Sequence, residues 1–221
     1  MQTLLYVIPL GIGAAFTPSL LALQILVTGQ DLWARRATAV AAGTALAFGI
    51  FGVLIILGFK QLPTPDVSGP DLVGGIVRLA ASVVLALSAI YLFTPHPMVQ
   101  KAVEARIQRY VQNSGAVMIF MIAFLLSIKD MSSFVMLVPA LHEIAIAPNV
   151  VEGALALVVL YVLALSPVLL PIGIRVFFDK KSHDPMARVY RFTMDHQFQI
   201  VGVVASLLAV YLAVTGWQSL V

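Results

Sequence analysis

The fold of this chain is decided by an apolar run with two charges near its middle, GAVMIFMIAFLLSIKDMSSFVMLVP at residues 115–139. The run is long enough to cross about 30 Å of hydrocarbon at roughly 1.5 Å per residue. Lys129 and Asp130 lie close to its centre, where each charge costs about 2.5–3.5 kcal/mol on insertion scales. An ionisable pair at this depth predicts an interior site rather than contact with lipid.

The composition of the whole chain also indicates a membrane protein. Of the 221 residues, 61% are hydrophobic and 10% are charged, whereas a soluble domain is about half apolar and a quarter charged. This composition excludes a soluble globule, a disordered chain and a nucleic-acid-binding module. The chain has no cysteine, which excludes disulfides, thiolate metal sites and thiol-transporting membrane oxidoreductases. Its four histidines have no spacing that suggests a metal site.

Six apolar runs predict membrane-spanning helices. They are Thr3–Val27, Ala37–Phe59, Leu72–Phe93, Gly115–Pro139, Val151–Phe178 and Phe198–Trp217. The first is expected to be a span and not a cleaved signal peptide, because it is too long and has no basic leader. The predicted fold class is therefore an all-α integral membrane protein, with residues 1–221 forming a single membrane domain.

Basic residues are concentrated in the first, third and fifth connections between these runs. Ten of the thirteen are there, if Arg175 in the last turn of the fifth run is counted with the fifth connection: Arg35, Arg36, Lys101, Arg106, Arg109, Arg175, Lys180, Lys181, Arg188 and Arg191. The positive-inside rule places these connections in the cytoplasm and both termini outside. The third connection, 96–113, has Val99, Val103 and Ile107 at helical spacing. It predicts a short cytoplasmic surface helix, for which simple anchoring on anionic lipid is the plainest role.

Two of the predicted spans are interrupted near the middle by polar residues. The first is interrupted by FTPS (Phe16–Ser19) and the fourth by SIKD (Ser127–Asp130). Each opens a set of three spans, and an odd number of spans per set makes the two sets oppositely oriented. We therefore expect repeat one at 1–95, the surface helix at 96–113 and repeat two at 114–221. Two interrupted spans in corresponding positions are the sequence pattern of a transporter site at the membrane midplane.

Pro18 is expected to break the first span. It has no backbone N–H and its ring clashes with the preceding turn, so a carbonyl there loses its helical partner. Protein, water or substrate must then satisfy that carbonyl, because lipid offers no donor. The alternative is an ordinary kink in a long helix.

The second and fifth spans differ in the residues that favour close packing. The second has small residues at spacing four, Ala39, Gly43 and Ala47, which allow a neighbouring helix to approach closely. The fifth has Ser166-Pro167 and Pro171 instead.

The candidate site is built around the central ionisable pair. Lys129 is expected to bind an anionic group, and Asp130 to take part in proton coupling or to orient Lys129; the alternative is an ion pair that locks two helices. Neighbouring residues on a helix do not face each other, so the pair needs an unwound helix, partners elsewhere or a wet cavity. Further candidates flank the two breaks: Thr17, Pro18, Ser19, Ser127, Ser132 and Ser133. Others lie elsewhere in the spans: Gln24 in the first, Thr44 in the second, Arg78 near the outer end of the third, and Ser166 and Pro167 in the fifth.

Three other features are given plainer interpretations. For Arg78, snorkelling to the outer surface and a role in an outward vestibule both remain open. His142-Glu143, at the outer end of the fourth span, predicts a solvated loop and not a metal pair. The rings of Tyr6, Trp33 and Trp217 suit the membrane interface.

Several of these motifs resemble the lysine-exporter superfamily of membrane transporters. The resemblance rests on Pro9-Leu10-Gly11, FTPS, LWARR (Leu32–Arg36) and Ala42-Gly43, and it is closest to the glycolipid-addressing, Sap-like branch. The fourth span of that branch usually has a motif like Asn-Pro-Lys-Asx. Lys129 and Asp130 match its last two positions, whereas Ser127 and Ile128 depart from the first two, so the second break lacks a proline.

The resemblance implies a six-span exporter of the bacterial inner membrane, built from two inverted three-helix repeats and often found as a homodimer. The branch is linked to moving glycolipids toward the cell surface, while the wider superfamily exports amino acids and small ions. Substrate-binding residues would then include Lys129 and Asp130, which match the motif.

Two transport functions are compatible with the sequence. The first is an exporter of a lipid or glycolipid with an anionic headgroup, for which a lone central Lys is suited. The second is a proton-coupled exporter of amino acids or other small solutes, with Asp130 as the coupling residue. A membrane enzyme is disfavoured, because no nucleophile–His pairing, acidic magnesium cluster or nucleotide loop occurs. We expect no cofactor, and as partners only the substrate, the membrane and a second copy, with no nucleic acid.

Overall fold

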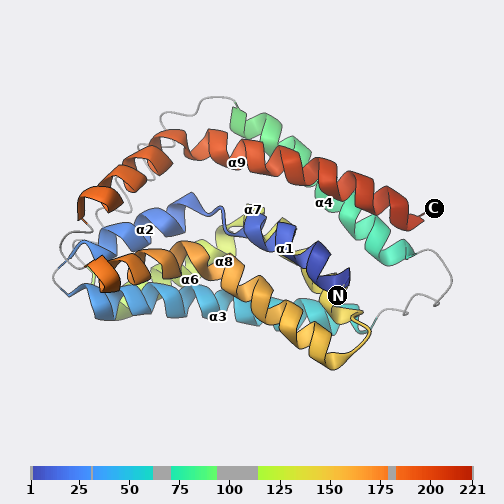
Figure 1. Cartoon of the computed structure of the whole chain (residues 1–221), viewed down its shortest axis with the longest axis horizontal. Helices are drawn as coiled ribbons and strands as arrows, with labels where there is room; N and C mark the ends of the chain where they lie inside the picture. The colour runs from blue at the N-terminus through green and yellow to red at the C-terminus, as the bar shows by residue number, and fades with distance from the viewer. Residues whose placement is uncertain (1, 31, 62–70, 94–113, 179–182, 221) are drawn as a thin grey trace.

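The computed structural model of the chain describes residues 2–30, 32–61, 71–93, 114–178 and 183–220, which form helices and short connections without a strand (Figure 1). The surface helix predicted at 96–113 lies outside these residues. The helices are α1 (Gln2–Ala14), α2 (Pro18–Thr28), α3 (Trp33–Phe59), α4 (Leu72–Phe93), α6 (Ala116–Lys129), α7 (Met131–Ala145), α8 (Val150–Phe178) and α9 (His183–Leu220).

The helices long and apolar enough to cross a membrane are α3, α4, α8 and the Phe198–Leu220 part of α9. Two further spans arise if each bent pair is one span: α1 with α2, bent by 63°, and α6 with α7, bent by 74°. The described chain therefore has four to six candidate spans and is a multi-pass membrane protein. The bent pairs coincide with the two interrupted spans that the sequence predicts.

Two helix ends differ from the predicted ones by more than four residues. The fourth span is expected to end at Pro139, but α7 continues to Ala145 with Pro139 inside it, since prolines are tolerated in membrane helices where neighbouring groups satisfy the freed carbonyl. The sixth span was expected to begin at Phe198, but α9 begins at His183 and includes most of the charged segment before the span.

Helix packing in the two halves of the chain is matched. Helix α1, which opens the first half, packs on α8 of the second half. Helix α6, which opens the second half, packs on α3 of the first half. Likewise α2 contacts α8 and α9, while α7 contacts α3 and α4. The remaining pair, α4 and α9, run side by side along one edge of the molecule (Figure 1).

Two buried apolar clusters lie on either side of the helix breaks. One includes Leu10 of α1, Leu85 of α4 and Met136 of α7. The other includes Leu23 of α2 and Ile119 of α6. The breaks between α1 and α2 and between α6 and α7 thus connect two separately packed regions.

The small-residue face of the second span makes the close contact that the sequence predicts. Gly43 lies so near α6 that a Cβ there would be 2.4 Å from the Phe120 carbonyl oxygen and 3.2 Å from the Phe124 nitrogen. Only glycine allows the two backbones to approach this closely.

Candidate functional site at the two helix breaks

The first break separates α1 from α2 at Ala15–Thr17. Thr17 precedes α2 with φ −114° and ψ 82°, and Pro18 is the first residue of that helix. Because Pro18 has no N–H, the carbonyl of Ala14, four residues earlier, loses its helical donor. The hydroxyl of Ser133 donates to this Ala14 carbonyl over 2.9 Å. The carbonyl freed by the proline is therefore satisfied by the other half of the chain.

The second break is centred on Asp130, between α6 and α7. Asp130 has φ −79° and ψ 81°, so its ψ matches that of Thr17 although no proline follows it. The helix is interrupted between Lys129 and Met131, which confirms the unwound alternative for the central pair. Aspartate is favoured at the residue before a helix, where non-helical backbone is the norm.

Ser133 connects the two breaks. Its hydroxyl lies 2.9 Å from the Ala14 carbonyl oxygen and 2.8 Å from Asp130 Oδ2. A hydroxyl has one proton to donate, so with Asp130 ionised the two acceptors compete for it. A protonated Asp130 would instead donate to Ser133, which would leave the Ser133 proton for Ala14.

A polar hollow of about 240 Å³ lies between the two breaks. It is lined by Thr17, Pro18, Ser19, Leu20, Leu126, Lys129 and Asp130. The Lys129 side chain is exposed at this hollow and that of Asp130 is half-buried. Among the residues that the structure describes, Lys129 has no ion-pair partner. The hollow therefore offers an anionic ligand the Lys129 ammonium and the Ser19 hydroxyl, with the Asp130 carboxylate beside them.

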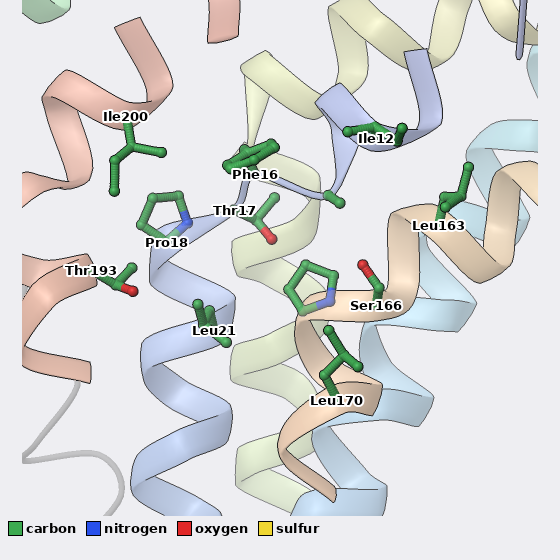
Figure 2. A pocket seen from close by; sticks show the side chains of 12 residues that line it. Ile12, Phe16, Thr17, Pro18, Leu21, Leu163, Ser166, Leu170, Thr193 and Ile200 are labelled. Carbon is green, nitrogen blue, oxygen red and sulfur yellow. The ribbon is translucent and has the colours of Figure 1, made fainter. Parts of the chain in front are cut away.

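An apolar pocket of about 350 Å³ lies beside the same first break, between α8 and α9. Figure 2 shows Ser166 and Leu170 of α8 on one side of Thr17 and Ile200 of α9 on the other. Thr17 and Pro18 line both the pocket and the hollow. Of the predicted site residues, the structure thus brings Thr17, Pro18, Ser19, Lys129 and Asp130 to the hollow, and Ser166 and Pro167 to the pocket.

Other predicted site residues lie elsewhere. Gln24 is fully buried, and its amide donates to the Ala37 carbonyl of α3 over 3.4 Å. Ser127 is buried and donates to the Ala123 carbonyl of its own helix over 2.7 Å. Thr44 is buried in α3, and its hydroxyl has no partner among the described residues. These three side chains are buried within the bundle and do not line the hollow.

The structure corrects the interpretation of Arg78 and of the His142-Glu143 pair. Arg78 is 6% exposed and forms an ion pair with Glu143, so it does not snorkel to the surface. Its guanidinium also contacts the Ser219 hydroxyl and lies 4.9 Å from the centre of the Tyr6 ring. His142 and Glu143 are 3% and 8% exposed, and the expected solvated loop is wrong because α7 extends past Pro139 and packs them against α4.

Three side chains of the described part of the chain are close enough for a metal ion. Asp71, His142 and Glu143 each bring one ligand atom within 4.8 Å of the others. Glu143 is already paired with Arg78, whose positive charge opposes a cation at the same place. The arrangement is therefore an interhelical ion pair rather than a metal centre.

Sequence reasoning missed the apolar residues of the pocket, such as Ile12, Leu163 and Ile200. No sequence signal separates them from the many other apolar residues of the spans. It also missed Glu143 as the partner of Arg78, which the need of any buried guanidinium for a nearby carboxylate could have suggested.

The fold and the site define a class: a polytopic helical membrane protein with two broken helices that meet at a polar hollow. The family model described as Sap, sulfolipid-1-addressing protein, matches residues 7–218. The chain belongs to this family, and the match supports the glycolipid-addressing branch and a lipid-related role in the membrane. Searches of curated proteins and of solved structures gave no match.

Proposed function

We propose that this protein is an exporter that moves a lipid or glycolipid with an anionic headgroup across or out of the membrane. The headgroup binds in the hollow between the two breaks, at Lys129, and the hydroxyl group of Ser19 contributes to its binding. The family's description, which names a sulfolipid, supports a sulfated or similarly charged headgroup.

The observation that carries this proposal is the exposed Lys129 ammonium in a hollow at the end of α6. An ion-paired lysine would serve to hold two helices, whereas an ammonium with no described partner is available to a sulfate or phosphate. A hydrogen bond to a charged group contributes about 1.5–3 kcal/mol, which is roughly 10- to 100-fold in binding.

We also propose the full topology: six spans in two inverted three-helix repeats, both termini outside, in the bacterial inner membrane. The matched packing of α1 on α8 and α6 on α3 supports this relation between the halves, as does the shared ψ of Thr17 and Asp130. Membership of the lysine-exporter superfamily, function without a cofactor, the absence of enzymatic activity and assembly as a homodimer are parts of the same proposal.

Proton coupling at Asp130 is the second candidate, for a lipid or for a small solute. The contact that favours it is the Ser133 hydroxyl, which reaches both Asp130 Oδ2 and the Ala14 carbonyl of the other break. Protonation of Asp130 would change which of these bonds forms, and so would link a proton to the geometry of both broken helices.

A reconstituted assay tests the proposed function. Purified protein in phosphatidylcholine vesicles is given a fluorescent, singly sulfated glycolipid, and its movement between leaflets is followed by quenching; efflux of amino acids is measured in parallel. Lys129→Ala is expected to slow lipid movement about 10- to 100-fold, with Lys129→Arg closer to wild type. Lys60→Ala, at the end of α3, removes an equal charge away from the hollow and is the matched control.

Two results would contradict the proposal. One is lipid movement by Lys129→Ala at the wild-type rate. The other is amino-acid efflux by wild-type protein without any lipid movement, which would favour a small-solute exporter.

A further inference from the structure

The proposed headgroup site does not account for the apolar pocket beside the first break. Its volume is about 350 Å³, and its walls come from α1, α2, α8 and α9. Figure 2 shows Leu21, Leu163 and Ile200 around it, from three different helices. A water molecule occupies about 30 Å³ of liquid, and a methylene group is of similar size. The pocket thus has room for roughly ten methylene groups.

The pocket and the polar hollow share one wall. Thr17 and Pro18 line both, so an anionic group beside Lys129 and an apolar chain in the pocket would be separated by the width of the first break. A ligand that fills both must be amphipathic, with its polar and apolar parts joined near Thr17.

Thr17 is the observation that points to such a ligand. Its side chain is 5% exposed, and its Oγ1 has no hydrogen-bond partner among the described residues. A buried polar group without a partner is destabilising and is rare in native structures. In Figure 2 the Thr17 side chain points from the break toward Ser166 of α8, into the pocket. This hydroxyl is placed to donate to an oxygen at the junction of headgroup and chain.

We infer that the pocket holds the first part of an acyl chain of the lipid whose headgroup binds at Lys129, with Thr17 donating to the oxygen that links them. This inference rests on the proposed function. The pocket gains no hydrophobic binding energy over the bilayer, because lipid tails are as apolar as its leucines. The pocket instead keeps the acyl chain out of water while the headgroup occupies the hollow. Each methylene group left in water would lower the population of this lipid-bound state about fourfold.

Photocrosslinking tests where the chain lies. The probe is a singly sulfated glycolipid with a diazirine in the proximal half of one acyl chain, added to wild-type protein in phosphatidylcholine vesicles and mapped by mass spectrometry. We expect Leu21, Leu163 and Ile200 to be labelled several-fold more than Val203, which is 49% exposed on α9 and lies outside the pocket. Equal labelling of Val203 and the pocket residues would overturn the inference.

A pair of variants on α9 tests the effect on transport. Ile200→Trp fills the pocket, while Val203→Trp makes a substitution of similar size on an exposed face of the same helix. Ile200→Trp is expected to slow the long-chain sulfated lipid at least tenfold and to leave a short-chain lipid with the same headgroup within about twofold of wild type. Equal slowing of both lipids, or no slowing of either, would refute a chain site.

The two proposals fail in different ways. One outcome is that Lys129→Ala moves neither lipid and that Ile200→Trp affects the long-chain and short-chain lipids equally. This outcome would support the exporter and reject the chain pocket. If wild-type protein moves neither lipid, the exporter is rejected, and the crosslinking pattern still decides whether an acyl chain occupies the pocket. If Ile200→Trp does not fold, crosslinking of the wild-type protein is the deciding measurement.

Discussion

In the part of the chain that the structure describes, two ionisable pairs within or between helices differ in their surroundings. Arg78 and Glu143 are buried, paired with each other and joined by the Ser219 hydroxyl and the Tyr6 ring. Lys129 is exposed at a hollow and Asp130 is half-buried at a helix break. Charge within a span therefore does not by itself mark a binding site. The group that we propose to bind a ligand is the one that the protein leaves accessible.

The largest expected effect separates the two pairs by stability. Arg78→Met leaves Glu143 buried without its partner and should lower the free energy of unfolding by about 3–5 kcal/mol. Lys129→Met removes an accessible charge and should change that free energy by less than about 0.5 kcal/mol. Thermal unfolding of both variants in the same detergent measures the difference.

A double variant sharpens this contrast. Arg78→Met combined with Glu143→Leu should recover most of the lost stability, because a buried pair replaced by apolar residues is often tolerated. Similar losses in Arg78→Met and Lys129→Met would mean that both pairs are structural and would contradict the distinction.

A smaller effect on the free energy of unfolding is expected at the contact between α3 and α6, the helix that ends at Lys129. Gly43→Ala places a Cβ 2.4 Å from the Phe120 carbonyl oxygen, and such overpacking costs about 1–3 kcal/mol. Gly49→Ala on the same helix has no atom within 4 Å of its added Cβ. It should be neutral or slightly stabilising, because alanine is the better helix former. Denaturant titration compares the two; an equal response would show that α3 and α6 do not approach this closely.

The smallest expected effect concerns the bond that joins the two breaks. Ser133→Ala removes the donor to the Ala14 carbonyl and should lower the free energy of unfolding by about 1 kcal/mol. In a Pro18→Ala background, residue 18 has an N–H that can bond to the Ala14 carbonyl. Ser133→Ala should then lower the free energy of unfolding by less. A double-mutant cycle measures this coupling, and purely additive effects would indicate that Ser133 acts only on Asp130.

The sequence predicts most of the fold because its signals are strong. The apolar runs locate the helices to within a few residues in α3, α4 and α8, and the polar interruptions locate both breaks. Pro18 even predicts a freed carbonyl, and Ser133 satisfies it. These features depend on residues close together in the chain, so a single sequence is enough to predict them.

Contacts between residues far apart in the chain are not fixed by local chemistry. Arg78 and Glu143 are far apart in the chain, and their pairing depends on how α4 packs on α7. The residues of the apolar pocket have the same hydrophobicity as those that face lipid, so only the packing of α9 beside α1 and α2 distinguishes Ile200 from Val203.

Lys129 is the group that we propose to recognise the charge of the lipid. The direct measurement compares movement of a singly sulfated glycolipid with its desulfated form, in vesicles that contain wild-type protein or Lys129→Gln. We predict that wild-type protein moves the sulfated lipid faster and that Lys129→Gln moves the two forms at equal rates. A preference for the sulfated lipid that persists unchanged in Lys129→Gln would contradict the account.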